Sequence, residues 1–464
     1  MWGSPGPRAG TRRPSRQRGR RRESSAVWSP VYHLPEGVSA PHPQECHALG
    51  MPRRGEVLAL VQAGGQGSRM DVLTRERAKP ALPYGGVHKL IDFALSGLVH
   101  ADLADVWVSL EYQVTSIDDY LSGGRPWSLD RNRGGFRRIV PQTGTGPATE
   151  SGFAHGNGDL LLRMSADIES FGARTLVVCS ADHVFNMDLA PVVEEHVAAG
   201  RVATVLTSEV TKKDASDNVV VLAGRDGTIT AVEDKPSRPS AGRVATEIFV
   251  YDTEVLLDTL RDLRRELSGA ASDGQDEADG DSGIGDFGEH LLPRLAATGR
   301  AVAVPLTGYW RDVGQPGLYL QSHRDLLAGK VDVFDAPDRP VISHWPDRPA
   351  SRVRATGECR DSLLSPGADV AGLVSGSVLG PGVVVEKGAE VHDSVVMEDC
   401  VIRAGAVVRT TVLDERCEVL AGARVGAEPT RRLAHDDDLV LVGRDSRVSG
   451  RIAAGARLEP GSAT

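Results

Sequence analysis

The sequence predicts an α/β domain built on an open, mostly parallel sheet with helices on both faces, followed by a left-handed parallel β-helix. Two observations predict this fold class. Short apolar runs recur at the spacing of βαβ units in the first part of the chain, and aliphatic residues recur at every sixth position near its end. We therefore expect a basic leader over 1–54, an α/β domain over 55–325, a connector over 326–365 and a β-helix domain over 366–464.

The composition is that of an ordinary globular protein. The chain has 464 residues, of which 40% are hydrophobic and 25% are charged, and this length suggests about two to four domains. Since no stretch approaches the roughly 18 uninterrupted apolar residues of a membrane-spanning helix, we expect no membrane partner. The five cysteines are scattered and form no CxxC pair. This pattern excludes a disulfide framework and a cysteine-rich zinc site, and it favours a reducing cytoplasm.

The net charge of −10 conceals an asymmetry between the leader and the rest of the chain. Residues 1–54 hold ten arginines and three glutamates, a balance of +7, so that residues 55–464 carry −17. An acidic body argues against a nucleic-acid partner, because binding to phosphates needs a basic face. The leader has no helical or strand period, and we expect it to be disordered. Our preferred interpretation is an inert tail before a true start at Met51; a transit peptide or a nucleic-acid arm is the alternative.

The first element of the folded chain is a buried strand over 57–61, which leads directly into the glycine-rich segment 64–69. Glycines at this place let the backbone approach a nucleotide, with N–H groups turned toward a phosphate. Arg69 and Lys79 follow and supply charge-assisted contacts to a di- or triphosphate. The segment matches neither GxxxxGK(S/T) nor GxGxxG. A glycine-rich turn after a strand has a structural role about as often as it binds a nucleotide. This segment therefore does not decide the function by itself.

Further apolar runs complete the α/β pattern. The runs are 106–110, 175–179 and 202–206, and a helical stretch covers 160–171. In open sheets of this kind the ligand lies beyond the carboxyl ends of the strands, where Asp182 and Asp312 are expected. A pair of carboxylates that faces a polyphosphate suits Mg²⁺. An isolated Asp at a strand end is more often a helix cap or turn former, but the glycine-rich segment favours the metal-binding interpretation.

The C-terminal region contains a repeat of six residues. From Val378 onward the last position of every hexad is aliphatic: Val383, Ala389, Val395, Val401, Val407, Leu413, Val419 and Val425. This period fits neither a helix nor an alternating strand. It is typical of hexapeptide repeats, in which each coil of three hexads stacks onto one continuous core. A solenoid has open ends and faces, so we expect a homo-oligomer.

Several motifs follow one another in the order found in a known family. They are the segments 63–69, 73–81 and 85–96, Ser180–His183, Asp286–Gly288 and Tyr309–Gly314. Together they resemble the sugar-nucleotide pyrophosphorylases, and within that family the glucose-1-phosphate adenylyltransferase branch. The resemblance implies a Rossmann-like nucleotidyltransferase domain. It also implies a reaction of ATP with glucose 1-phosphate that gives ADP-glucose and pyrophosphate for glycogen or α-glucan biosynthesis, in a homotetramer.

The resemblance also implies roles for individual residues. Catalysis is expected of Arg69, Lys79 and Asp182. Nucleotide binding is expected of Gly64, Gly65, Gly67, Gln113, Gln142, Gly156 and Asp159, and sugar-phosphate binding of Asp234, Lys235 and Thr246. Asp182 and Asp312 are expected to carry Mg²⁺. His183 is expected to be structural, beside Asp182.

Departures from the family pattern lie mainly around the expected sugar pocket. Asp234 replaces a glutamate, Val219 replaces a glycine, and Ala245 replaces a serine. Glu76 stands where the family has an activator-site lysine, which argues against the same regulation. Hydrogen bonds at such pockets discriminate strongly between sugars. Two alternatives therefore stay open: a pyrophosphorylase for another sugar nucleotide, and a non-catalytic regulatory subunit. The retained charged residues argue against the second.

Overall fold

A computed structural model describes residues 55–131, 134–141, 153–270, 282–331, 336–427 and 438–464. The predicted leader, 1–54, lies outside the described residues. The described residues all belong to one compact unit. Within the described part of the chain, no helix is long and apolar enough to span a membrane.

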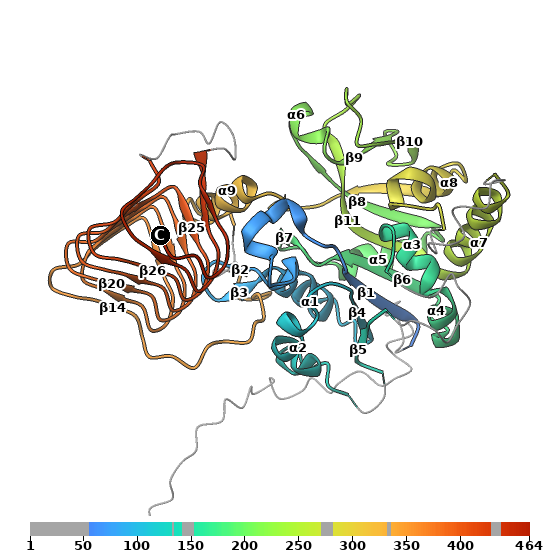
Figure 1. Ribbon diagram of the computed structural model, residues 1–464. Coiled ribbons are helices and arrows are strands. Elements are labelled where there is room, and N and C mark those ends of the chain that lie inside the picture. Colours follow the sequence, from blue (N-terminus) through green and yellow to red (C-terminus); the bar gives the residue numbers. More distant parts are fainter. Residues whose placement is uncertain (1–54, 132–133, 142–152, 271–281, 332–335, 428–437) are drawn as a thin grey trace, which may run out of the picture. The chain divides into compact units, whose positions relative to one another are not determined.

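A nine-stranded sheet forms the centre of the α/β region (Figure 1). Its strands are β1 (Val57–Ala63), β4 (Val106–Leu110), β5 (Phe136–Ile139), β6 (Thr175–Ser180), β8 (Ala203–Glu209), β9 (Val219–Ala223), β10 (Ile229–Asp234), β11 (Arg243–Asp252) and β12 (Ala301–Pro305). β1 pairs in parallel with β4 and β6, and β4 with β5 and β8 with β12 are also parallel. β11 runs antiparallel to both β6 and β8. The sheet is thus mixed and mostly parallel around β1, and the predicted fold class is confirmed.

Alternate residues of β1 feed two hydrophobic cores, because successive side chains of a strand point to opposite faces. Ala59 and Val61 belong to one core, and Leu58 and Leu60 to the other. The first core is packed against α1 (Leu90–His100), α2 (Thr115–Leu121), α5 (Ala190–Ala198) and α9 (Pro316–Leu327). The second is packed against α3 (Asn157–Arg163), α4 (Ser165–Phe171), α7 (Thr253–Ala270) and α8 (Leu292–Ala296). Helices therefore cover both faces of the sheet, as Figure 1 shows.

Shorter elements connect these helices and strands. They are the 3-10 turns η2 (Ser68–Thr74), η3 (Lys79–Ala81) and η4 (Ser122–Trp127), the helix α6 (Lys212–Ala215), the π-turn η7 (Phe287–Leu291), and the two-stranded pairs β2 (Pro83–Tyr84) with β3 (His88–Lys89) and β7 (His183–Phe185) with β13 (Trp310–Asp312). The helix predicted over 160–171 is divided at Met164, which separates α3 from α4. The hydroxyl of Ser165 donates to Leu161 O there, a local bond that competes with a continuous helix.

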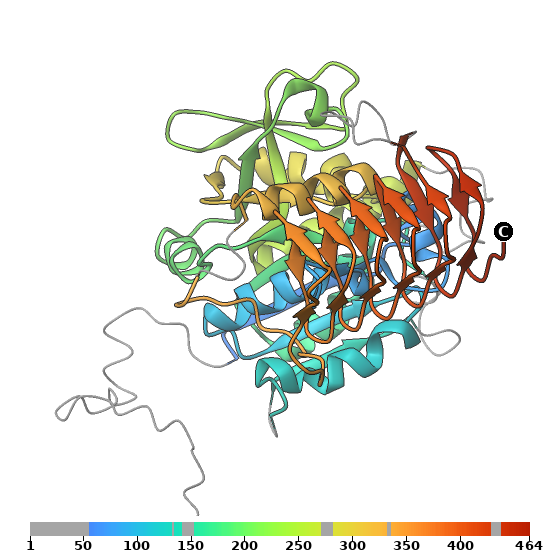
Figure 2. The same ribbon diagram turned by 90° about the vertical axis from the view of Figure 1, so that its left-hand side faces the viewer.

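The C-terminal region is a stack of coils that builds three parallel sheets of six strands each, and Figure 2 shows the coils stacked side by side. The first sheet holds β14 (Arg352–Val353), β17 (Asp369–Val370), β20 (Val384–Val385), β23 (Val401–Ile402), β26 (Glu418–Val419) and β29 (Arg447–Val448). The second holds β15 (Glu358–Arg360), β18 (Leu373–Ser375), β21 (Glu390–His392), β24 (Val407–Arg409), β27 (Arg424–Val425) and β30 (Arg451–Ile452). The third holds β16 (Leu363–Leu364), β19 (Val378–Leu379), β22 (Val395–Val396), β25 (Thr411–Leu413), β28 (Val440–Val442) and β31 (Arg457–Leu458). This arrangement is consistent with the predicted left-handed β-helix.

The coils do not keep the predicted length of three hexads. Val384 pairs with Val401, and Val401 pairs with Glu418, so these coils are 17 residues long rather than 18. One corner, at 393–394, spans two residues, whereas the corners on either side span four. Residues 385, 402, 419 and 448 therefore stack on one another and point into the core. Positions spaced by exactly six residues do not stay aligned with this stack. The first coil already begins at Arg352, within the range expected for the connector.

Candidate active site

A pocket of about 320 Å³ lies beyond the carboxyl ends of β1 and β6. The parallel register sets Gln62 of β1 beside Ser180 of β6, so the segments that follow the two strands meet at one edge of the sheet. The charged residues that line the pocket are Arg69, Lys79, Asp182, Asp217, Lys235, Glu247, Asp286 and Asp312. Gly65, Gly67, Gly156 and Gly314 also line it. A site with fixed cations, carboxylates and exposed backbone suits a polyphosphate and a metal ion.

The glycine-rich segment has a backbone that a larger residue would disturb. Gly67 has φ of 67°, and a Cβ at this position would lie 2.9 Å from Lys79 Cβ. Gly67 O accepts hydrogen bonds from Met70 N and from the hydroxyl of Thr74. The turn thereby packs directly on Lys79, which brings the backbone of the segment and the ammonium group to the same wall of the pocket.

Lys79 holds two carboxylates from distant parts of the chain. Its Nζ lies 2.5 Å from Asp182 Oδ2 and 3.7 Å from Asp312 Oδ1. The hydroxyl of Ser180 donates to the other oxygen of Asp182. Burial opposes the charge on Lys79, but Asp182 and Asp312 outweigh burial and raise the pKa of Lys79. Burial likewise disfavours the charge on Asp182, and Lys79 and His183 reverse this and hold its pKa below the ordinary value.

His183 connects the two predicted metal-binding aspartates. It starts β7, and the antiparallel register of β7 with β13 places Asp312 directly opposite it. Nδ1 of the buried imidazole lies 2.9 Å from Thr246 O. Nε2 lies 3.7 Å from both Asp182 Oδ1 and Asp312 Oδ1. Burial lowers the pKa of His183, but Glu247 and the two aspartates outweigh it and raise that pKa.

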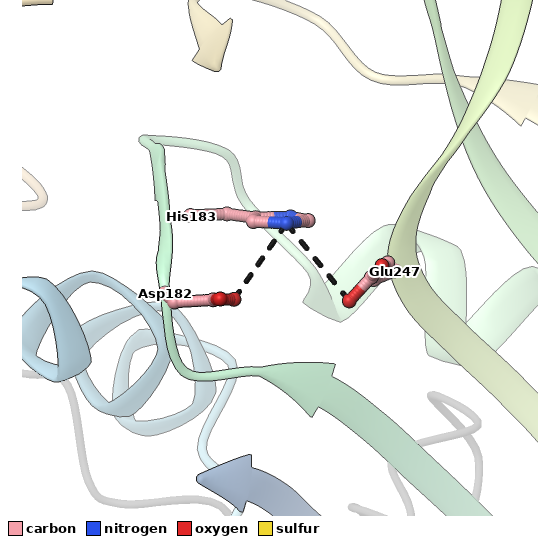
Figure 3. Close-up of side chains that lie close together, drawn as sticks. All are labelled: Asp182, His183 and Glu247. Atoms are coloured by element: carbon pink, nitrogen blue, oxygen red, sulfur yellow. Dashed lines mark ion pairs between the residues drawn. The ribbon is translucent and has the colours of Figure 1, made fainter. Parts of the chain in front are cut away.

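Glu247 is a pocket residue that the sequence analysis did not single out. Its Oε2 lies 3.9 Å from His183 Nε2, on the side opposite Asp182 in Figure 3. The residue has φ of 56°, a left-handed conformation that costs a non-glycine residue about 1–2 kcal/mol. The pairing of β11 with β8 also shifts register between Ala245 and Phe249. Glu247 lines the pocket from this irregular segment; the only sign of it in the sequence is that the strand at Ala245–Glu247 departs from the family pattern.

A second cation lies on the pocket wall. Lys235 Nζ is 2.7 Å from Asp286 Oδ2, and the side chain is half exposed. Asp286 caps η7 and also accepts a hydrogen bond from Asn157 N. Burial opposes the charge on Lys235, but the bond to Asp286 outweighs it and raises the pKa of Lys235. The ammonium group is thus charged, oriented and open to an anion.

The wall beside Lys235 is crowded. A Cβ on Gly288 would lie 2.5 Å from Asp234 Oδ1 and 2.6 Å from Val219 Cγ2. Asp234 Oδ1 is buried and has no hydrogen-bond partner among the described residues. Burial raises the pKa of Asp234, while Lys235 opposes the rise. Val219 therefore occupies space in which the family pattern has only a glycine.

Some predicted site residues do not line this pocket. These are Gly64, Gln113, Asp159, Asp234 and Thr246, and Gln142 lies outside the described residues. Gln113 Nε2 donates to Arg75 O. Asp159 is fully buried and accepts from Arg163 and from the hydroxyl of Ser282. Thr246 directs its hydroxyl to Leu206 O, while its own carbonyl accepts from His183.

Comparison with known proteins agrees with this geometry. The nucleotidyl transferase family model matches residues 58–329. The chain belongs to the nucleotidyl transferase family. A second model, GlmU-like C-terminal hexapeptide, matches residues 349–437, in the region of the stacked coils.

Similar members of the family share one name, and they come from different bacteria. The glucose-1-phosphate adenylyltransferase of Acetivibrio thermocellus is 32% identical over 348 residues, which cover 74% of this chain and 77% of that protein. The same enzyme of Clostridium perfringens strain 13 is 31% identical over 74% of this chain and 83% of its own length. That of Thermomicrobium roseum is 33% identical over 72% of this chain and 80% of its own length. The family recognised in the sequence is confirmed, and the protein is a nucleotidyltransferase.

Proposed function

We propose that this nucleotidyltransferase makes ADP-glucose and pyrophosphate from ATP and glucose 1-phosphate, for the synthesis of glycogen or another α-glucan. A phosphate oxygen of glucose 1-phosphate attacks the α-phosphorus of ATP, and the bond from that phosphorus to the bridging oxygen of the β-phosphate breaks. No covalent bond to the protein forms. The observation that carries the proposal is the convergence of Arg69, Lys79, Asp182, Lys235 and Asp312 on one pocket, together with the shared name of the relatives.

The glycines and the cations of the pocket bind different parts of the two substrates in this reaction. Backbone N–H groups of Gly65 and Gly67 cradle the nucleotide. Arg69 and Lys79 bind the triphosphate and stabilise the charge that builds up on the departing pyrophosphate. Lys235, oriented by Asp286 at 2.7 Å, binds the phosphate of the sugar phosphate and aims its oxygen at the α-phosphorus. Positioning of two anions at fixed cations accounts for most of the catalysis that such a transfer needs.

The reaction also needs a divalent cation, which nucleotidyl transferases generally use. Asp182 and Asp312 fit Mg²⁺, because both are partly exposed oxygen donors on the pocket wall and both face the same buried ammonium group. When bound, the ion supplies positive charge to the phosphate oxygens. Lys79 holds the two carboxylates in place before the substrates enter.

Another sugar nucleotide is a second candidate product, and the crowded wall favours it. Val219 lines the pocket near Lys235, while Asp234 lies outside the lining, against Gly288, and Glu247 adds a carboxylate to the pocket. A carboxylate hydrogen-bonds sugar hydroxyl groups, and its exact reach decides which hydroxyls it meets. Asp234, one methylene shorter than a glutamate, does not reach the pocket lining, so the bulk of Val219 and the carboxylate of Glu247 would favour a different sugar from the family's usual one.

We further propose that the chain is a cytoplasmic homo-oligomer, by resemblance a tetramer. Hexapeptide regions often associate, and the stacked coils offer their faces to other copies. A division into a catalytic domain over 55–325, a connector and a β-helix domain likewise remains our proposal, with the β-helix beginning at its first coil, at Arg352, rather than at residue 366 as the sequence suggested.

A release assay tests the proposed reaction. The full chain is incubated with Mg²⁺, one of ATP, UTP, GTP or dTTP, and one of several sugar 1-phosphates, and pyrophosphate is measured. ATP with glucose 1-phosphate is expected to give the fastest release. Preference for another sugar would establish the second candidate instead, and preference for UTP or dTTP would refute adenylyl transfer. Absence of release with every pair would refute catalysis.

A further inference from the structure

The imidazole of His183 lies at the centre of a group of carboxylates. The ring is 4% exposed. Nδ1 is 2.9 Å from Thr246 O, and because a carbonyl oxygen only accepts, Nδ1 carries the hydrogen. Nε2 points the other way, toward Asp182 and Glu247, as Figure 3 shows. It makes no hydrogen bond within the described part of the chain, because its nearest carboxylate oxygens are 3.7–3.9 Å away.

The spacing of these atoms fits a shared metal ion. Two ligands that each lie about 2.1 Å from one cation are separated by about 3.0–4.2 Å, and Nε2 is 3.7 Å from Asp182 Oδ1 and 3.9 Å from Glu247 Oε2. One ligand atom from each of Asp182, His183 and Glu247 lies within 4.8 Å of the others. A buried nitrogen and several carboxylate oxygens thus surround one small volume.

Lys79 leaves this volume open. Its ammonium group binds Asp182 through Oδ2, whereas Oδ1 of the same carboxylate faces His183. Asp312 Oδ1 lies 3.7 Å from both Lys79 Nζ and His183 Nε2. Asp182 therefore has Oδ1 on the side away from Lys79, and Asp312 Oδ1 lies between Lys79 and His183, within reach of the same volume.

We propose that His183, through Nε2, and Glu247 are further ligands of the divalent cation carried by Asp182 and Asp312, and that this mixed site prefers Mn²⁺ to Mg²⁺. Magnesium favours oxygen ligands and usually keeps several waters. Imidazole favours transition ions, and Mn²⁺ accepts carboxylates as well. The inference deepens the proposed function by naming the ligands and the preferred ion of the same pocket.

Metal binding without substrates tests this inference. The full chain is stripped with a chelator and titrated with MnCl₂, and bound ion is measured by the loss of the free Mn²⁺ signal in electron paramagnetic resonance. We expect one tight site per chain. Pulsed measurements should show ¹⁴N coupling from the imidazole of His183. Binding without ¹⁴N coupling, or no binding at all, would overturn the proposal.

Two variants of matched charge sharpen the test. Glu247→Gly removes the carboxylate and also relieves the left-handed backbone, so the fold is retained; Mn²⁺ affinity should fall at least about tenfold. In the unaltered chain Mg²⁺ should displace bound Mn²⁺ only at a concentration well above that of Mn²⁺, and displacement at equal concentration would overturn the preference for Mn²⁺. Asp217→Asn removes one charge from an exposed residue of the same pocket and should leave the affinity unchanged. Equal affinity in the unaltered chain and Glu247→Gly would refute the role of Glu247.

Failure of this inference is distinct from failure of the proposed function. The resonance measurement needs no turnover, so missing ¹⁴N coupling leaves the pyrophosphate assay untouched. Conversely, if the chain releases no pyrophosphate with any pair of substrates, the resonance measurement still identifies the ligands of the bound Mn²⁺.

Discussion

Arg77 offers a sharp test of how the glycine-rich half of the active site is held in place. Its guanidinium is 3% exposed and binds Asp414 at 2.7 Å and Glu415 at 2.9 Å. These partners belong to the β-helix and lie far away in the sequence. Burial opposes the charge on Arg77, but the two carboxylates outweigh it and raise the pKa of Arg77. Burial also raises the pKa of Asp414, although Arg77 opposes the rise, whereas Arg77 and Arg444 lower the pKa of Glu415 against burial. The cluster is almost free of water, and Arg77 is the cation that stabilises both carboxylates in it.

Arg77→Met should destabilise the fold by about 3–5 kcal/mol, because removal of one partner leaves a buried charge without compensation. Asp414, only 2% exposed, is the group left alone, whereas Glu415 keeps Arg444 as a partner. The measurement is the free energy of unfolding from urea titrations. Arg265→Met is the control: Arg265 pairs with Asp262 on the surface of α7 with most of its side chain exposed, and such pairs contribute about 0–1 kcal/mol.

The double variant Arg77→Met with Asp414→Asn tests whether the uncompensated charge of Asp414 causes the loss of stability. Since the second change removes the orphaned charge, it should recover part of the lost free energy. A double variant that is no more stable than Arg77→Met would refute the argument from the buried charge. A cost below about 1 kcal/mol for Arg77→Met, the range of a surface pair, would refute it as well.

Three further predictions concern the pocket and the core. Asp182→Asn should lower the rate of pyrophosphate release at least about 100-fold while the circular dichroism spectrum stays unchanged, since the variant loses a charge that binds Lys79 and that we propose binds the metal; full activity would show that Asp182 does not belong to the site. Gly67→Ala should lower release at least about tenfold, because the new Cβ meets Lys79 in a left-handed backbone; normal kinetics would contradict this. His323 accepts from Gly85 N and burial lowers its pKa to about 4, so the folded state keeps it neutral. The stability it contributes is complete above about pH 6.5 and is lost as pH falls toward 4, by about 1.4 kcal/mol per unit; unfolding free energies that stay flat from pH 7 to 5 would refute this.

The elements of the fold that depend on local pattern were predictable. The apolar runs at 106–110 and 175–179 became β4 and β6 almost residue for residue, because a buried parallel strand is a short continuous apolar run. The hexapeptide period identified the stacked coils. It did not give the 17-residue length of the coils from Val384 to Glu418, because that length depends on corners such as the two-residue corner at 393–394.

Some residues of the candidate site could likewise be predicted from the sequence, and others could not. Glycines and charged residues beside a strand end are visible in the sequence, and Arg69, Lys79, Asp182, Lys235 and Asp312 indeed line one pocket. By contrast, Asp159 is held by Arg163 and Ser282 inside the core. A motif shows that an aspartate is present, but not whether its carboxylate faces a ligand or a buried arginine. Only the packing around the residue distinguishes these two cases.

The sequence by itself determined the fold class, the family and most of the charged groups of the pocket, since these follow from periodicity and from motifs of adjacent residues. Tertiary structure alone decided which distant groups meet. Glu247 reaches His183 through a left-handed residue and a register shift in β11, and Arg77 meets Asp414 across more than 300 positions of the chain. Such contacts depend on where separate elements pack, and packing is the sum of many weak interactions that no local stretch of sequence contains.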